Sequence, residues 1–317
     1  MKSKSYHTVV VGAGHAGLAA SYYLKQSNIN HVVFERGRIG ESWLSQRWDS
    51  FKLNSPNKIN CLPGQTQRRQ IENEFSSHLE FASSLKQYAI QFQLPVQENT
   101  CVISIEKTET KQFRILINRK GREEELFSSH VIIASGLQNE KKLPAFSAAI
   151  PSSILQLHAS EYRSPNQIKS DAVLIVGSAQ SGCQIAADLV EAGKIVFLST
   201  SKVGRLPRWY RGRDVLDWLF EMKFFDMRPQ DVPDPAMLHS TAPQLTGVGD
   251  GKSTISLQHL ASKAVTLLGR VANATRYELS ILPNLKENIQ TADSVSANIK
   301  EMIDGFITKM NTEEKLW

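Results

Sequence analysis

Two glycine-rich segments of the same pattern carry the residues with the clearest chemistry. Gly12, Gly14 and Gly17 form the first, and Gly177 and Gly182 mark the second, 165 residues further along the chain. In the pattern Gly-x-Gly-x-x-Gly, the glycines permit a tight turn, let a diphosphate approach the backbone and let a helix pack closely on a strand. The helix start that follows offers free N–H groups to the phosphates. Two such segments predict two dinucleotides, a flavin and a nicotinamide, with hydride transfer between them.

Both segments lie in the sequence context of a βαβ unit, which makes the pattern specific. Glu35 ends the second strand of the first unit, 18 residues after Gly17, where a carboxylate can accept hydrogen bonds from ribose hydroxyl groups. The apolar runs and their periodicity predict strands at 6–11 and 31–35 around a helix at 16–26, and strands at 172–176 and 194–198 around a helix at 181–192.

We therefore predict an FAD site in the first unit. An acid at position 35 suits a ribose without a 2′-phosphate. The residues assigned from the fingerprint and the positions after the second strand are Gly12, Gly14, His15, Ala16, Gly17, Glu35 and Arg36.

The second segment departs from the pattern in two places. Ala179 stands where the middle glycine is usual, so a methyl group lies where the diphosphate would approach. Thr200, 18 residues after Gly182, stands where Glu35 stands in the first unit, and no carboxylate is present there to repel a 2′-phosphate. With cations just beyond the strand, this favours NADPH over NADH. The residues assigned are Gly177, Ser178, Ala179, Gln180, Ser181, Gly182, Thr200, Lys202, Arg205 and Arg208.

A nucleic-acid surface is the alternative interpretation of the cations at 202–213. Trp209 and Tyr210 interleave them, as aromatic side chains do in single-strand binders. We favour a nucleotide phosphate, because the cluster directly follows the strand beside which a phosphorylated ribose would lie. The prediction is therefore a small-molecule partner and no nucleic acid.

Composition fits a chain with two α/β domains. The sequence has 317 residues, of which 41% are hydrophobic and 21% charged, and its net charge of +6 fits anionic cofactors as well as it fits nucleic acid. Cys61, Cys101 and Cys183 are too far apart in sequence for a redox dithiol or a zinc site, and so low a count is typical of a reducing compartment. We predict no metal, a cytoplasmic location and no membrane span, since no run approaches about 20 apolar residues.

The fold class expected is α/β, with two Rossmann-like, three-layer dinucleotide-binding domains. Runs at 101–105, 113–117 and 125–127 predict an antiparallel β-meander inserted before a strand at 131–134. We expect an FAD-binding domain at 1–165, an NADPH-binding domain at 166–285 and an amphipathic C-terminal helix at 286–317. Apolar residues at helical spacing predict that this helix packs on its own domain.

These motifs resemble those of the class B flavoprotein monooxygenases, especially bacterial flavin-containing and plant auxin-type enzymes. Arg36 to Trp43 is similar to the segment after the ribose-binding acid, and Ile132 to Gly136 is similar to the Ala-Thr-Gly segment that links the two nucleotide domains. Residues 158–162 match the end, and not the start, of a family signature. The resemblance adds four residues near the flavin, which are Trp43, Asn54, Ser135 and Gly136.

What the resemblance implies is an NADPH-consuming monooxygenase. NADPH reduces FAD, and the reduced flavin forms a C4a-hydroperoxide with O2 that oxygenates nitrogen, sulfur or a carbonyl carbon of a small organic substrate. Asn54 is the candidate polar group near the flavin edge, with a loop asparagine that bonds its own backbone as an equal alternative. Trp43 fits a core aromatic equally well.

The end of the chain departs from this family. No second Ala-Thr-Gly-like segment follows residue 300, so the FAD domain is expected to lack its last strands. The chain is then a fragment, or closes differently, or is completed by a partner chain or a homo-oligomer. A non-catalytic flavin- or nucleotide-binding subunit is the main alternative function, and a flavin disulfide reductase is disfavoured because the dithiol is missing.

Overall fold

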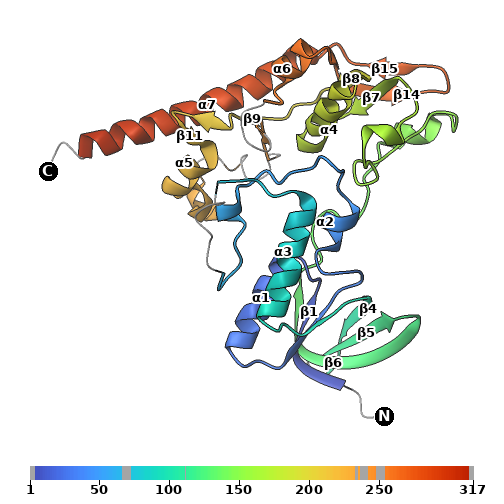
Figure 1. The fold of residues 1–317 in the computed structure, drawn as a ribbon, viewed down its shortest axis with the longest axis vertical. Coiled ribbons are helices and arrows are strands. Elements are labelled where there is room, and N and C mark those ends of the chain that lie inside the picture. Colours follow the sequence, from blue (N-terminus) through green and yellow to red (C-terminus); the bar gives the residue numbers. More distant parts are fainter. Residues whose placement is uncertain are drawn as a thin grey trace. The chain divides into compact units, whose positions relative to one another are not determined.

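The computed structural model describes residues 4–65, 73–110, 112–232, 235, 242–247 and 254–313. The chain divides into two compact units: unit 1 comprises Met1–Lys142 with Ser160–Tyr162, and unit 2 comprises Leu143–Ala159 with Arg163–Trp317 (Figure 1). The C-terminal helix is thus part of unit 2 and does not stand alone. Which unit binds which cofactor stays a prediction.

Unit 1 is built on one mixed six-stranded sheet with the order β3-β2-β1-β6-β5-β4. Strands β3, β2, β1 and β6 run parallel, and β6, β5 and β4 run antiparallel. Its elements are β1 (Lys4–Val11), α1 (His15–Gln26), β2 (His31–Phe34), α2 (Glu41–Ser45), η1 (Asn57–Ile59), α3 (His78–Gln91), β3 (Val96–Gln97), β4 (Thr100–Lys107), β5 (Phe113–Arg119) and β6 (Arg122–Ile133).

One strand, β6, belongs to both halves of this sheet. Residues 122–128 pair with β5 and residues 126–133 pair with β1, with Val9 opposite Val131. The sequence reading of separate runs at 125–127 and 131–134 is therefore corrected: they form a single strand of 12 residues. The meander is a continuation of the nucleotide-binding sheet, because no turn residue interrupts 122–133.

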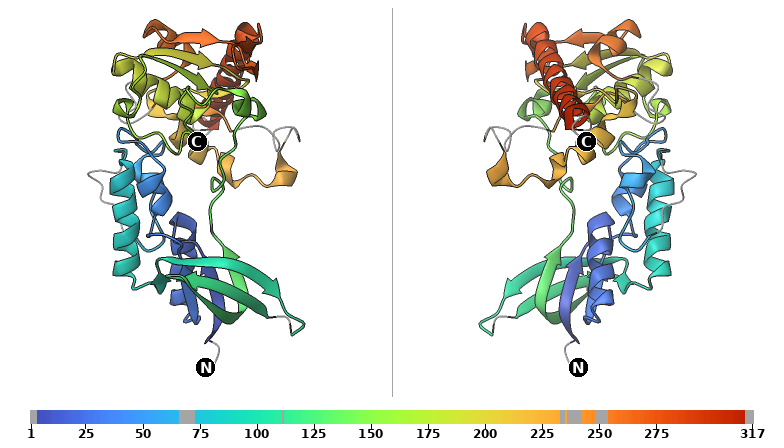
Figure 2. Two further views of the ribbon diagram at one scale, coloured as in Figure 1. Left: turned by 90° about the vertical axis from the view of Figure 1, so that its right-hand side faces the viewer. Right: turned by 90° about the vertical axis from the view of Figure 1, so that its left-hand side faces the viewer.

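The core of unit 1 lies between the parallel strands and the meander. Val9 and Phe34 of the parallel strands share an apolar cluster with Ile115 and Ile117 of β5, and all four are almost fully buried. On the other face, α1 packs on β1 and β2, and α3 packs on α1 (Figure 2). This is the expected three-layer arrangement, and each fully buried aliphatic side chain contributes roughly 1.5–3 kcal/mol to it.

Unit 2 repeats the βαβ pattern on a smaller, parallel sheet with the order β13-β8-β7. The α/β fold class predicted from the sequence is confirmed. The elements of unit 2 are η3 (Ala145–Ala149), η4 (Pro165–Gln167), β7 (Ala172–Val176), α4 (Gln180–Glu191), β8 (Ile195–Ser199), β9 (Arg205–Leu206), β10 (Trp209–Tyr210), β11 (Arg213–Asp214), α5 (Val215–Glu221), η5 (Phe224–Asp226), η6 (Pro229–Asp231), β12 (Gln244–Leu245), α6 (Leu257–Ser262), β13 (Thr266–Leu268), β14 (Val271–Ala274), β15 (Leu279–Ile281) and α7 (Leu285–Glu313).

The long helix α7 packs within unit 2, as its apolar face predicts. Ile303 is fully buried beside Leu206, Val215 and Trp218. On the same helix, Asp304 accepts hydrogen bonds from residues on β10 and in the turn after it. No helix in the described part of the chain has the length and apolar character needed to cross a membrane.

Candidate functional site

The first glycine loop joins β1 to α1, and its three glycines have different tasks. Gly12 has φ +105°, and a Cβ atom there would lie 2.4 Å from the carbonyl oxygen of Ala134. A Cβ atom on Gly17 would lie 1.9 Å from the carbonyl oxygen of Gly12. Gly14, the N-cap of α1, faces open space, with no atom within 4 Å of its Cβ position. The backbone geometry requires the first and third glycines, whereas the second leaves room for a ligand.

The second loop, between β7 and α4, repeats this geometry. Gly177 has φ +109°, and a Cβ atom on Gly182 would again lie 1.9 Å from the carbonyl oxygen of the first glycine. Ala179 is the N-cap of α4 with φ −77° and ψ −173°, close to the −85° and −170° of Gly14. Alanine therefore adopts the backbone of the middle glycine without strain. Its exposed methyl group is a steric difference from Gly14 at the same position.

The two helices that follow these loops begin without side-chain caps. Among the described residues, neither N-cap, Gly14 of α1 or Ala179 of α4, forms a side-chain cap hydrogen bond, and neither first turn contains an acid. By contrast, Ser77 caps α3, Asp214 caps α5 and Ser256 caps α6. The free N–H groups and the positive dipole ends of α1 and α4 are suited to binding an anion.

Glu35 lies at the end of β2 and holds the first loop in place. Its carboxylate is 8% exposed and accepts hydrogen bonds from the backbone N–H groups of Ala13, at 2.8 Å, and Gly37, at 2.9 Å. A carboxylate accepts about four hydrogen bonds, so capacity for ribose hydroxyl groups remains. The ribose-binding role of Glu35 stays a prediction.

Asn139, which the sequence analysis did not identify as a candidate, is hydrogen-bonded to three residues that it did identify, Arg36, Ser135 and Gly136. Asn139 accepts a hydrogen bond from Arg36 at 3.2 Å and donates to the carbonyl oxygens of Ser135, at 2.8 Å, and Gly136, at 3.1 Å. This brings the residues after β2 and those after β6 to one end of the sheet. No motif marks Asn139, so nothing in the sequence alone indicates it.

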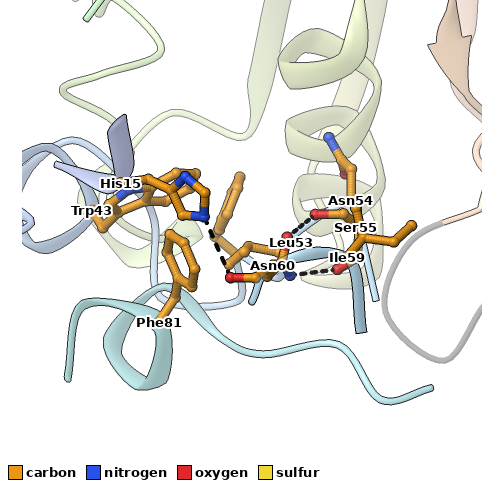
Figure 3. Close-up of a pocket in the computed structure, with 9 residues that line it drawn as sticks. His15, Trp43, Leu53, Asn54, Ser55, Ile59, Asn60 and Phe81 are labelled. Atoms are coloured by element: carbon orange, nitrogen blue, oxygen red, sulfur yellow. Dashed lines mark hydrogen bonds between the residues drawn. The ribbon is translucent and has the colours of Figure 1, made fainter. Parts of the chain in front are cut away.

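Beside the first loop lies a pocket of about 310 Å³, drawn in Figure 3. Three of the predicted residues, His15, Trp43 and Asn54, line it. Asn60, which the sequence analysis missed, also lines the pocket. Its backbone oxygen lies 3.3 Å from His15 Nε2 and accepts a hydrogen bond when that nitrogen carries the proton. Two further hydrogen bonds join Asn60 to Ser55. The remaining lining residues are Phe51, Leu53, Ile59 and Phe81.

Trp43 combines the two roles that the sequence left open, because it both lines the pocket and packs on other aromatic rings. Its ring lies edge-on to Phe81, with centroids 5.0 Å apart. The guanidinium of Arg47 lies 4.9 Å from the Trp43 ring centre, and burial lowers the pKa of Arg47. Trp48, by contrast, is a buried core residue.

Three polar side chains assigned to the second site are engaged inside unit 2. Ser178 Oγ is buried and accepts a hydrogen bond from the N–H of Ser201 at 3.1 Å. The side-chain amide of Gln180 bonds both the N–H and the carbonyl oxygen of Leu245, at 3.0 and 3.3 Å. Thr200 donates to Leu268 and accepts from Asn288. These hydrogen bonds are made within unit 2, and the assignment of Ser178, Gln180 and Thr200 to the nucleotide stays a prediction.

The arginines assigned to a phosphate are also buried. Arg205 is 3% exposed and donates from Nε to Gln244 at 3.0 Å. Arg208 is equally buried and forms an ion pair with Asp214 at 2.6 Å. Burial lowers the pKa of both guanidinium groups. Both arginines thus lie in the interior of unit 2, and their assignment to a nucleotide phosphate stays a prediction.

Lys202 is the exposed member of the three cations assigned to the phosphate, and it pairs with Glu287 at 2.6 Å. Arg211 and Arg213, further along the segment, pair with Asp304 and Glu221. Of the residues assigned to the second site, Ala179, Ser181 and Lys202 are exposed, and their contact with the nucleotide stays a prediction. An acidic partner for each exposed cation also weakens the nucleic-acid interpretation.

The three cysteines are far from forming a dithiol. Cys61 is half-buried, Cys101 is exposed and Cys183 is buried, and none is in a disulfide. Burial raises the pKa of the Cys183 thiol to about 11. In the described part of the chain, no group of three metal-ligating side chains comes together.

Comparisons with known proteins agree with the two-loop architecture. The sequence profile of the family described as pyridine nucleotide-disulphide oxidoreductase matches residues 9–209. An uncharacterized oxidoreductase CzcO-like from Geobacillus kaustophilus is 34% identical over 211 residues, which cover 66% of this chain and 59% of that protein. A probable indole-3-pyruvate monooxygenase, YUCCA10 from Arabidopsis thaliana, is 29% identical over 212 residues, covering 66% of this chain and 54% of the relative.

Among solved structures, a variant of a flavin monooxygenase from Stenotrophomonas maltophilia has the same fold. The TM-score is 0.65 at 21% identity, and the match covers 87% of this chain and 73% of the other. The aligned part of the chain spans only 59% and 60% of the two Geobacillus and Bacillus velezensis oxidoreductases that it matches.

Proposed function

Because the chain belongs to the pyridine nucleotide-disulphide oxidoreductase family, we propose that it is an oxidoreductase of the flavin monooxygenase kind that binds FAD and NADPH. The observation that carries the proposal is the pair of uncapped helix starts, α1 and α4, each behind a glycine loop of the same geometry. A protein with one dinucleotide has no use for the second loop. The names of its relatives, a flavin monooxygenase and a probable indole-3-pyruvate monooxygenase, support the same reaction class.

FAD fits the first site. Its diphosphate would bind the free N–H groups at the start of α1, in the open space at Gly14. Glu35 would accept hydrogen bonds from the adenosine ribose, and Ser135 and Gly136 would lie beside the cofactor. When bound, the flavin supplies hydride acceptance and the activation of O2, which protein side chains do not provide.

The pocket beside the first loop would hold the reacting end of the cofactor and a small organic substrate. Trp43, Phe51 and Phe81 give it apolar walls that exclude water. Asn54, Ser55 and Asn60 place amide and hydroxyl groups among these walls, where they can orient a polar ligand by hydrogen bonds. The chain's own contribution is thus binding, orientation and exclusion of water.

NADPH fits the second site less tightly. Its diphosphate would bind the start of α4, where the methyl group of Ala179 takes part of the space that Gly14 leaves free. Lys202 is the exposed cation available to a 2′-phosphate once it exchanges Glu287 for the ligand. We therefore expect a weaker nucleotide affinity here than at a site with glycine in the middle position.

A nucleotide-binding subunit without catalysis is the second candidate function. The observation that favours it is Ala179 at the N-cap of α4, whose methyl group takes part of the space that Gly14 leaves open in the first loop. A dithiol-based disulphide reductase is not supported, because the three cysteines lie apart and Cys183 is buried.

Purification in air, followed by flavin absorbance and NADPH consumption with added FAD, tests the proposal. Product and hydrogen peroxide are measured together on amine, thioether and ketone substrates. Oxygenated product in proportion to NADPH supports the monooxygenase. Bound flavin without NADPH consumption supports the non-catalytic subunit, and absence of bound flavin at saturating FAD contradicts both.

A further inference from the structure

The second strand of each βαβ unit is followed by a different kind of residue. Glu35 follows β2 in unit 1, whereas Thr200 follows β8 in unit 2 and donates its hydroxyl proton to the carbonyl oxygen of Leu268 at 2.8 Å. Ser201 N–H donates to Ser178 Oγ at 3.1 Å, so the segment after β8 lies against the second glycine loop. A ribose bound at that loop would therefore meet the side chains that follow Thr200.

A carboxylate reaches this segment from a distant part of the chain. Glu287, in the first turn of α7, forms an ion pair with Lys202, with 2.6 Å between Oε1 and Nζ. Both side chains stay accessible to a ligand, since 56% of Glu287 and 59% of Lys202 are exposed. An acid is thus present beyond the second strand in both units. It comes directly after β2 in unit 1 and from α7 in unit 2.

The packing of α7 places Glu287 at this position. Asn288, which is only 1% exposed, donates from Nδ2 to Thr200 Oγ1 at 3.0 Å. Gly204 lets the helix approach closely, because a Cβ atom there would lie 2.8 Å from Cγ1 of Val295. Buried contacts on both sides of Lys202 therefore fix the first turns of α7, and Glu287 does not depend on the exposed ion pair for its location.

The pair of opposite charges can distinguish a hydroxyl group from a phosphate. A ribose 2′-hydroxyl can donate a hydrogen bond to the Glu287 carboxylate and accept one from the Lys202 ammonium, so both charged groups keep a partner. A 2′-phosphate can accept from Lys202, but it carries nearly two negative charges at pH 7 and is repelled by the carboxylate. The cation that attracts NADPH is thus paired with an anion that opposes it.

We propose that Glu287 is a specificity-determining residue of the second site, which limits the preference for NADPH and lets the site accept the unphosphorylated ribose of NADH. The inference rests on the proposed function, because it requires a nicotinamide dinucleotide at the second loop. Glu287 acts in binding alone and takes no part in hydride transfer. Removing its charge leaves Lys202 free for a 2′-phosphate and deprives a 2′-hydroxyl of an anionic acceptor.

A purely structural role is the alternative for Glu287. An acid in the first turn of a helix interacts favourably with the positive end of the helix dipole, and an exposed ion pair adds little to stability. This alternative predicts that Glu287→Gln slightly destabilises the fold and leaves nucleotide choice unchanged. The two roles therefore differ in one measurable quantity, the ratio of the affinities for the two nucleotides.

Nucleotide binding without turnover tests the proposal. The probes are NAD+ and NADP+, which cannot reduce the flavin, and each is titrated calorimetrically into the full chain saturated with FAD. The quantity compared is the Kd for NAD+ divided by the Kd for NADP+, so that a general loss of affinity cancels. In Glu287→Gln we expect this ratio to rise about fivefold over the parent, as repulsion between exposed charges a few ångströms apart implies.

Two further variants sharpen the comparison. Glu301→Gln is the matched control, because it removes the same charge from an exposed position about 21 Å further along α7. Its ratio should equal that of the parent. Glu287→Lys replaces repulsion by attraction, so its ratio should exceed that of Glu287→Gln. Circular dichroism of all three variants verifies that the helix is retained.

Three results would overturn the proposal. The same ratio in the parent and in Glu287→Gln would leave Glu287 with the structural role alone. An equal rise in Glu287→Gln and Glu301→Gln would assign the effect to net charge. Binding of neither nucleotide by the parent at up to about 1 mM would refute the second site and the proposed function with it. In the first two cases the parent still binds nucleotide, so the proposed function stands and only the role of Glu287 fails.

Discussion

The carbonyl oxygen of Gly177 lies 1.9 Å from the position that a Cβ atom on Gly182 would occupy, and Gly12 and Gly17 repeat the relationship in unit 1. This contact is a property of the bare chain, with no ligand involved. It divides each fingerprint into a part that the fold requires, the first and third positions, and a part that the ligand requires, the second position.

Replacing the third glycine should therefore damage the fold. In Gly17→Ala the methyl group meets backbone, which cannot move aside as a flexible side chain would, so we expect a loss of roughly 1–3 kcal/mol in the free energy of unfolding. Gly14→Ala, at an open position, is the matched control and should change stability little. Denaturant unfolding of both variants without cofactor measures this, and equal stability of the two would contradict the division.

Replacing the second glycine should affect only the ligand. Gly14→Leu places a side chain in open space, so the fold should persist while the FAD diphosphate is excluded. Gly305→Leu makes the same change at an open position on α7 and should retain flavin. Flavin absorbance of the purified variants, with circular dichroism for the fold, gives the comparison. Flavin retained by Gly14→Leu would count against the first site.

The buried ion pair between Arg208 and Asp214 should contribute to the free energy of unfolding rather than to the preference for NADPH over NADH. Removing one partner leaves an unpaired buried charge, so Arg208→Ala should cost about 3–5 kcal/mol. Lys202→Ala breaks an exposed pair and should cost less than about 1 kcal/mol. We expect Lys202→Ala to fold, and its KM for NADPH should rise more than its KM for NADH. We expect Arg208→Ala to be too unstable for this comparison. A fully stable Arg208→Ala would show that the pair does not hold β9 to β11.

The three thiols should differ in reactivity. Cys183 has its pKa raised to about 11 by burial, so at pH 8 roughly one thiol in a thousand is ionised. Cys101 is exposed and should react first with a disulfide reagent, while Cys183 should react only when the protein unfolds. Mass spectrometry of the modified chain, before and after denaturant, identifies the order. Early modification of Cys183 in the folded protein would contradict its buried position in α4.

At acid pH the ion pair between Arg38 and Glu41, at the start of α2, should be lost. The hydrogen bond from Arg38 lowers the pKa of the Glu41 carboxyl from its usual 4.5 to about 2. A lowered pKa means that the contribution is complete above pH 4.5 and disappears as the pH falls from 4.5 through 2. Glu41→Gln should therefore be less stable than the parent at pH 7, and the difference should vanish toward pH 2. A difference that does not change with pH would show that charge is not its source.

The sequence predicted what depends on local pattern. Glycine spacing, apolar runs and the acid at position 35 were sufficient for both βαβ units and for His15 of the pocket, and the family resemblance added Trp43 and Asn54. These features are local, because a turn that needs Gly12 and Gly17 needs them whatever the rest of the chain does.

What could not be predicted depends on distant parts of the chain. Spacing placed Arg205 and Arg208 after the strand that ends near Thr200, but it did not indicate that they are buried against Gln244 and Asp214 in unit 2. Thr200 occupies the sequence position of Glu35, but its hydroxyl group bonds to Leu268 and Asn288, which no spacing rule connects to it. Asn139 and Asn60 have no motif, and only the folded backbone brings them to the site.

Because β6 pairs with both β5 and β1, insertions and deletions within this strand should be poorly tolerated during evolution. Gaining or losing one residue within 126–128, which pair with both β5 and β1, would turn every later side chain of β6 to the opposite face of the sheet. Ala134 would also leave the carbonyl group of Val11. Length variation among descendants of this chain should therefore be absent from 122–134 and should gather in the hairpin tip near Lys120, where the backbone turns in water.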